Sequence, residues 1–276
     1  MSAGWRRFVS HRLAVVGLAL IALLILLAAF AAQVAPRDPI RQDLPSALAP
    51  PSREFPLGAD EFGRCILSRI LYGARLSLVV GVLATAIGAV TGILLGLLAG
   101  YFPRLDAPVM RAMEVLLAFP SILLAIAIVA GLGPGLTNAM VAIAIVGFPI
   151  YTRLARGVVL SLRERDFVEA ARALGSSDRL ILRRHLLPHL LAPVVVAWSL
   201  DVGAKILATA GLSFLGLGTQ PPTADWGSML ATARTFVILS PHVALLPGLA
   251  IFLVVLSLNI LGDALQDYLD PRMRHG

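Results

Sequence analysis

The stretch Val168-Glu169-Ala170-Ala171-Arg172-Ala173-Leu174-Gly175 lies at the centre of a polar, arginine-rich segment between long apolar runs. Residues 158–189 are predicted to form a helical hairpin: a short helix, a glycine stop, a second short helix, and Pro188 where that helix ends or the next span starts. Gly175 suits the C′ position of the first helix, where a left-handed backbone is usual. Side chains that can cap the second helix are Ser176, Ser177 and Asp178.

The first helix of this hairpin is amphipathic. Its predicted apolar side carries Phe167, Ala170, Ala171 and Leu174. Arg165 and Glu169 are four residues apart, a spacing that supports a helix through an ion pair. A water-facing hairpin between apolar segments indicates a part that contacts another protein.

The rest of the chain has the composition of an all-α polytopic membrane protein. Of its 276 residues, 58% are hydrophobic and only 14% are charged, whereas soluble domains carry about 25% charged residues. No long basic patch with interleaved aromatic residues is present, which argues against binding of nucleic acid and leaves the lipid bilayer as the environment. The single cysteine, Cys65, excludes an intramolecular disulfide and a CxxC site.

Six transmembrane helices are predicted. Residues 115–152 contain no charge, yet a single helix of that length would be about 57 Å long against a hydrocarbon core of about 30 Å. The glycine-rich residues 131–135 are therefore predicted to separate two spans, which Pro120 and Pro149 kink. The predicted spans are residues 13–35, 76–102, 110–130, 136–157, 190–210 and 243–261.

The N-terminus offers two interpretations. Arg6-Arg7 before an apolar run resembles a twin-arginine signal, but residues 13–32 form a charge-free run of 20 residues. A signal sequence has an apolar region of about 7–15 residues, so an uncleaved anchor is predicted. The expected organisation is residues 1–35 as cytoplasmic segment and first span, 36–75 as a proline-rich extracytoplasmic loop, 76–262 as the membrane core with five spans and the hairpin 158–189, and 263–276 as a cytoplasmic tail.

Basic residues predict the orientation. With six spans, fifteen arginines fall on the side of the two termini and seven on the other side. Because basic residues mark the cytoplasmic side, both termini and the hairpin 158–189 are predicted to be cytoplasmic.

Two features within the spans each leave two readings open. Gly88, Gly92, Gly96 and Gly100 form a small-residue stripe, which fits either a contact with another subunit or packing within the chain. Asp201 and Lys205 are one helical turn apart, where charges in lipid are costly. They fit either a polar group on the translocation path or at a subunit interface, or a mutually neutralising pair with Lys205 extended to the outer surface.

No catalytic or metal motif is found. The chain has neither a P-loop nor HExxH. His185 and His189 are four residues apart, but no third ligand is near and zinc sites normally have at least three protein ligands. No enzyme activity, catalytic residue, metal or cofactor is therefore predicted for this chain, and any ATP must be bound by another chain.

The motifs carry a resemblance to a known family. The spacing Glu169-Ala170-Ala171, Gly175, Leu187-Pro188 resembles the EAA loop of ABC-importer permeases, with His185 where isoleucine is usual. Residues 56–64, 71–75, 212–222, 226–227, 259–263 and 269–272 resemble further signatures of the C-type permease of dipeptide, oligopeptide and nickel importers. Cys65 and Thr209 depart from that pattern, since Asp and Glu are expected there.

The resemblance implies the type I ABC-importer permease fold in the bacterial inner membrane. Its EAA loop docks the ATPase, which assigns the coupling residues Glu169, Ala170, Ala171, Leu174, Gly175, Leu187 and Pro188. The implied partners are a second homologous permease subunit, two ATP-binding subunits that hold ATP and Mg²⁺, and an extracytoplasmic substrate-binding protein.

Two other classes compete with this interpretation. A secondary, ion-coupled transporter would use Asp201 and Lys205, or Glu114, and inverted repeats would support it. No convincing repeat is found. An intramembrane enzyme has no supporting motif.

Overall fold

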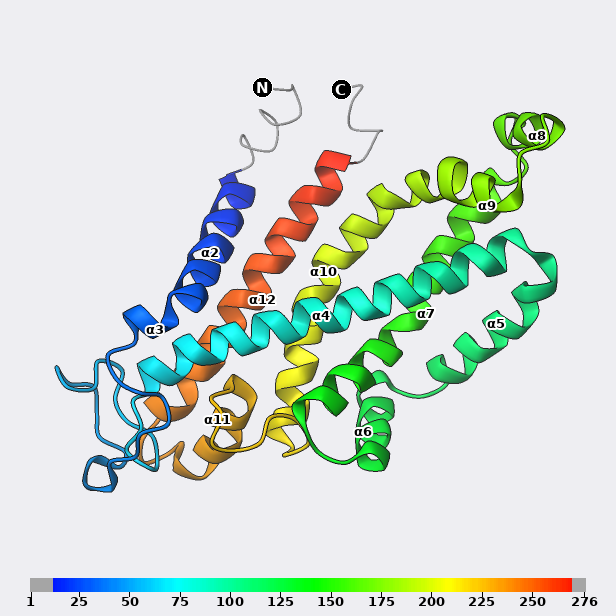
Figure 1. Ribbon diagram of the computed structural model, residues 1–276. Helices are drawn as coiled ribbons and strands as arrows, with labels where there is room; N and C mark the ends of the chain where they lie inside the picture. The colour runs from blue at the N-terminus through cyan, green and yellow to red at the C-terminus, as the bar shows by residue number, and fades with distance from the viewer. Residues whose placement is uncertain (1–11, 270–276) are drawn as a thin grey trace.

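The computed structural model describes residues 12–269, and most of them are helical (Figure 1). Over this range the β-structure is limited to an isolated bridge between Ala59 and Cys65, so the predicted all-α class is confirmed there. In chain order the helices are α2 (Arg12–Ala29), α3 (Ala31–Val34), η1 (Leu44–Ser46), α4 (Ile66–Tyr101), α5 (Pro103–Leu117), α6 (Ser121–Leu132), α7 (Leu136–Leu162), α8 (Asp166–Ala173), α9 (Asp178–Leu180), η2 (Ile181–Leu186), α10 (Leu187–Phe214), α11 (Trp226–Ala233), η3 (Arg234–Phe236) and α12 (His242–Leu269).

In the part of the chain that the structure describes, four helices are long and apolar enough to cross a membrane: α4, α7, the continuous helix from α9 through α10, and α12. Helices α5 and α6 make a fifth only when taken together as one broken span. Helix α2 is shorter, with an apolar run at Ala14–Ala29. The Arg6-Arg7 pair and half of the predicted cytoplasmic tail, residues 270–276, lie outside the described residues.

The predicted third span, 110–130, is wrong as a single helix. Helices α5 and α6 meet at an angle of 94°, and Pro120 is the N-cap of α6. Proline lacks an N–H and disfavours helical backbone in the residue before it, so the first helix ends and a second begins in a new direction. Pro149 does stay inside α7. The break at residues 131–135 is confirmed, because α6 ends at Leu132 and α7 begins at Leu136.

Helix α4 begins at Ile66, earlier than the span predicted from residue 76, and it packs tightly on α7. A Cβ atom on Gly92 would lie 2.7 Å from the Cβ of Tyr151, and one on Gly96 would lie 2.4 Å from the carbonyl oxygen of Thr152. The glycine stripe therefore packs within the chain, and the alternative of a subunit contact through this stripe is wrong. Small residues let the two backbones approach closely where lipid supplies no hydrophobic drive.

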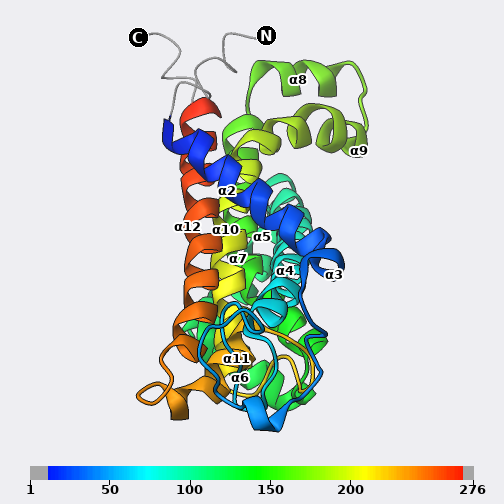
Figure 2. The same ribbon diagram turned by 90° about the vertical axis from the view of Figure 1, so that its left-hand side faces the viewer.

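The two ends of the helical assembly differ in content. The start of α2, the end of α12 and helix α8 lie at one end, as both views show (Figure 1 and Figure 2). The loop of residues 36–65, helix α11 and helix α6 lie at the other. The arginine-rich hairpin is therefore at the same end as the described limits of the chain, Arg12 and Leu269.

Candidate functional site

Helix α8 and the turn after it form the hairpin predicted from the sequence. Gly175 has φ +80°, its N–H donates to the carbonyl of Arg172 (2.9 Å), and the N–H of Ser176 donates to that of Ala171 (3.0 Å). These two bonds make a Schellman motif, which only a residue in the left-handed region completes without strain. Asp166 lies in the first turn of α8 and Arg172 in the last, the arrangement that the helix dipole favours.

The hairpin is attached to the spans by its inner face. Val168 and Ala171 are buried in one cluster with Ile181, Leu186 and residues at the ends of α4 and α7. At the turn, the Tyr101 hydroxyl donates to the Asp178 carboxylate at 2.6 Å, and the Arg172 guanidinium lies 5.3 Å from the centre of the Tyr101 ring. The position of α8 is therefore fixed to α4, α7 and the start of the α9–α10 helix.

The outer face of α8 is free within this chain. Glu169 and Ala170 are exposed, and 86% of Leu174 is exposed. The predicted apolar side is right at Ala171 only: Phe167, Ala170 and Leu174 are exposed, and the buried side consists of Val168 and Ala171. The predicted Arg165–Glu169 ion pair is absent among the described residues: Arg165 is the N-cap, and its carbonyl accepts from the N–H of Glu169 at 3.2 Å.

The second limb of the hairpin does not stop at Pro188. It runs from α9 through η2, a π-helical segment, directly into α10, where Pro188 is in the first turn. A π segment widens the helix and relieves the contacts that a proline ring makes with the preceding turn. Leu187 is half-buried and Pro188 is exposed, so the predicted coupling residues divide between α8 and the start of α10.

Asp201 and Lys205 pair inside the bundle. The Lys205 Nζ lies 3.5 Å from Asp201 Oδ1, and the Tyr151 hydroxyl of α7 donates to Asp201 Oδ2 at 3.0 Å. Lys205 is 6% exposed and Tyr151 is fully buried. The ammonium lies against Gly147, where a Cβ would be 3.1 Å from Nζ. The predicted pair is present and the extension of Lys205 to the outer surface is wrong, while a place of the pair on the translocation path or at a subunit interface stays a prediction.

A buried charge cluster at the opposite end from α8 was missed in the sequence. Asp60 pairs with Arg64 at 2.7 Å and with Arg69 at 3.4 Å, and all three residues are buried. The indole of Trp226 donates to the carbonyl of Ile70 at 3.1 Å. Asp60, Arg64 and Trp226 lie in the motifs quoted above. Asp60 precedes the helix, so its pairing with Arg69 nine residues later follows no helical spacing, and Trp226 lies 156 residues from Ile70.

Asp225, just before α11, adds a carboxylate to this end. Burial raises the pKa of Asp225 above its usual range, against the lowering effect of the N–H groups that it accepts from. Its carboxylate accepts from the N–H of Ser228 at 3.0 Å, so it caps α11.

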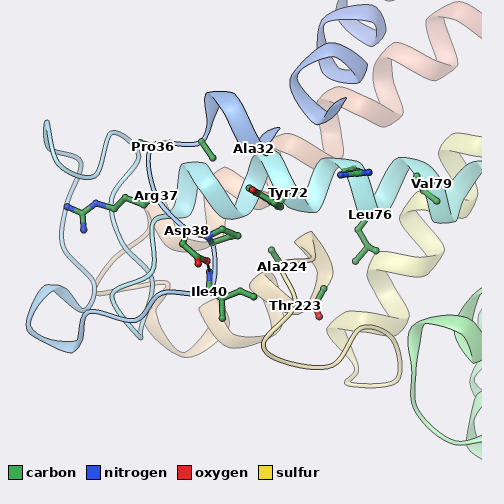
Figure 3. Close-up of a pocket in the computed structure, with 13 residues that line it drawn as sticks. Ala32, Pro36, Arg37, Asp38, Ile40, Tyr72, Leu76, Val79, Thr223 and Ala224 are labelled. Atoms are coloured by element: carbon green, nitrogen blue, oxygen red, sulfur yellow. Dashed lines mark hydrogen bonds between the residues drawn. The ribbon is translucent and has the colours of Figure 1, made fainter. Parts of the chain in front are cut away.

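A groove of about 840 Å³ opens at the same end. Figure 3 shows Tyr72, Leu76 and Val79 of α4 facing the chain after α3 and the Thr223–Ala224 segment. Arg37 turns away from it toward Glu54, with which it forms an ion pair. The groove is mainly apolar, and it lies where a partner can approach from the end opposite α8.

The other residues singled out in the sequence have structural places. The rings of His185 and His189 lie 6.4 and 5.8 Å from that of Phe167, and no group of three potential metal ligands occurs within residues 12–269. Cys65 is the buried N-cap of α4 without a side-chain bond; an aspartate there would offer one. The Thr209 hydroxyl donates to the Lys205 carbonyl at 2.8 Å.

Comparison with known families and proteins agrees with this arrangement. The family described as binding-protein-dependent transport system inner membrane component matches residues 92–275, and the N-terminal TM domain of oligopeptide transport permease C matches residues 2–51. The di/tripeptide transport system permease protein DppC of Pseudomonas aeruginosa (strain UCBPP-PA14) is 46% identical over 98% of this chain and 92% of its own length. The glutathione transport system permease protein GsiD of Escherichia coli O157:H7 is 48% identical over 98% of this chain and 90% of its own.

Solved structures support the fold. A chain of the inward-facing MetNI methionine ABC transporter aligns with a TM-score of 0.59 at 19% identity, covering 73% of this chain and 96% of that one. A chain of an amino acid ABC transporter aligns at 0.54 and 18% identity, covering 72% and 92%. The chain therefore belongs to the family of binding-protein-dependent transport system inner membrane components, as a C-type, multi-pass permease subunit of a bacterial ABC importer in the inner membrane and not an enzyme.

Proposed function

We propose that this chain carries short peptides across the inner membrane, and that α8 is the element through which separate ATPase subunits drive it. The observation that carries the coupling role is the two-sided burial of α8: Val168 is fully buried against the spans, while Leu174 is 86% exposed. A helix fixed on one side and free on the other can transmit a partner's movement. Glu169, Ala170, Ala171, Leu174, Gly175, Leu187 and Pro188 are the proposed coupling residues.

The proposed topology has six spans with both termini and α8 in the cytoplasm. It counts α2 with α3 as the first span and α5 with α6 as the third. The arginine distribution supports this orientation, as does the location of α8 at the end where α2 begins and α12 ends. The proposed organisation keeps residues 1–35, 36–75, 76–262 and 263–276 as its four parts, with the helix of the third part extended back to Ile66.

A working importer needs further chains. We propose a second permease subunit of similar fold, two ATP-binding subunits that hold ATP and Mg²⁺, and a binding protein that delivers the substrate at the extracytoplasmic end. The groove beside Tyr72 and Val79 is a proposed contact for that protein. Closure of the ATPases on ATP shifts the permeases between inward- and outward-open states only through contacts that differ between those states.

The proposed substrates are dipeptides, tripeptides or glutathione, because similar proteins are named for them. Oligopeptides and nickel chelates, which the sequence resemblance also implies, are alternative cargoes. We propose that Asp201, Lys205 and Tyr151 join α7 to α10 without contacting the substrate, since their buried charges already satisfy one another.

ATPase stimulation tests the coupling role. In the reconstituted complex, the loaded binding protein is expected to stimulate ATP hydrolysis, and Glu169→Lys or Gly175→Val to abolish that stimulation. The control is Gly157→Ala on α7, where an added Cβ has no heavy atom within 4 Å. Normal stimulation in both α8 variants would contradict the coupling role.

A further inference from the structure

Helix α5 presents two different exposed faces. Leu105, Pro108, Ala112 and Val115 form an apolar face, with Val115 61% exposed. A second, charged face carries Asp106, Arg111 and Glu114, and it is rotated by at least about 40° around the helix axis from the apolar face. These three residues line a pocket of about 350 Å³ together with Arg156 of α7. The apolar face suits lipid, and the charged face does not.

The charges of this pocket are unequally satisfied. Arg156 and Asp106 form a two-pronged pair with N–O distances of 2.5 and 2.7 Å. Arg111 and Glu114 are exposed, and the side chain of neither has a hydrogen bond or ion pair with any residue in the range 12–269. They are three residues apart, so they lie on one side of the helix, with Cβ atoms about 5–6 Å apart.

The location of this pair requires water or a ligand. In the proposed topology α5 and α6 together form the third span, and Glu114 lies in α5, 11 residues or about 16 Å along the helix from Pro103. Ionisable side chains within a membrane span face a water-filled cavity or another polar group. If the apolar face of α5 faces lipid, the charged face with Arg111 and Glu114 faces the interior of the assembled transporter.

We propose that Arg111 and Glu114 form a substrate subsite in the α8-side half of the translocation path, which binds the charged ends of a short peptide. The guanidinium would hold the carboxylate and Glu114 the ammonium, both through charge-assisted hydrogen bonds. An extended dipeptide spans about 7 Å, and two long side chains whose Cβ atoms are about 5–6 Å apart can reach both of its ends. The Asp106–Arg156 pair is internally neutral and forms the wall of the subsite.

This inference rests on the proposed function, so the test begins with ATP-driven dipeptide uptake by the reconstituted complex. Two single-cysteine variants are then compared in a Cys65→Ala background with cysteine-free partners. Ala107→Cys reports on the pocket, and Leu105→Cys reports on the apolar face, two residues or about 3 Å nearer the start of α5; both residues are exposed. The reagent is a membrane-impermeant, cationic thiosulfonate added from the ATPase side.

The Ala107→Cys variant is expected to react much faster than Leu105→Cys, and Ala-Ala to slow that reaction. N-acetyl-Ala-Ala-amide, which lacks both charged ends, is expected not to slow it. Adding Arg111→Gln or Glu114→Gln should raise the protecting concentration of Ala-Ala about tenfold, because a charge-assisted bond is lost.

Equal reaction at the two positions, or equal protection by the uncharged peptide, would overturn the subsite while leaving the transport function intact. Failure of the initial ATP-driven uptake would instead count against the proposed function.

Discussion

Truncation of Leu174 to alanine separates docking of the ATPase from folding of the permease. The side chain is 86% exposed in this chain, so its removal should change the free energy of unfolding by at most about 0.5 kcal/mol. If an ATPase subunit buries it, the change removes three carbon atoms from the contact, about 2.4 kcal/mol at ~0.8 kcal/mol each. That corresponds to about 50-fold weaker association.

The assay is titration of the ATPase subunits onto the permease pair held in lipid nanodiscs. Val168→Ala is the matched control on the same helix, because Val168 is fully buried. It should lower the stability of the hairpin by about 1.6 kcal/mol or more, through lost burial and the cavity left behind. Association that weakens less than about threefold in Leu174→Ala, under 1 kcal/mol, would refute the docking role of this side chain.

Three further predictions concern the bundle and its outer end. Gly96→Ala should lower the thermal midpoint of the purified complex, since its Cβ would lie 2.4 Å from the Thr152 carbonyl and overpacking costs about 1–3 kcal/mol; Gly157→Ala should not, and equal effects would contradict the α4–α7 contact. Lys205→Met should destabilise the complex by about 3 kcal/mol because it leaves Asp201 charged and without its ion-pair partner. The double variant Asp201→Leu with Lys205→Met should recover most of that loss in thermal unfolding. A double variant that loses as much stability as the two single variants together would contradict the pairing. Burial raises the pKa of Asp225, so protonated Asp225 stabilises the fold: this stabilisation is complete below the unfolded pKa of about 3.9 and is lost as pH rises through the folded pKa. Asp225→Asn should therefore flatten the dependence of the free energy of unfolding on pH. An unchanged dependence in the variant would contradict this prediction.

The sequence predicted the elements that depend on local signals. The short helix that ends at Gly175 and the break at residues 131–135 follow from glycine and from helical periodicity, and the structure has both, although the second limb of the hairpin 158–189 continues into α10. Helix boundaries were less predictable. Helix α4 begins at Ile66 and includes Arg69, whose charge led hydropathy to place it outside the span. In the fold, Asp60 neutralises that charge.

Contacts across long sequence distances could not be predicted. Tyr151 lies 50 residues from Asp201, and nothing in either segment indicates that they meet until α7 and α10 are packed. The buried side of α8 was assigned wrongly, apart from Ala171, for the same reason. Its amphipathic pattern distinguishes two faces, but only the packed ends of α4 and α7 determine that Val168 is covered and Leu174 is not.

The most direct test of the transport claim is uptake of a labelled dipeptide into proteoliposomes that contain this chain, its permease partner, the ATPase subunits and the binding protein. Uptake is expected to require ATP and the ATPase subunits and to proceed without any ion gradient. Uptake that an ion gradient drives in the absence of ATP and the ATPase subunits would contradict the account and favour a secondary transporter.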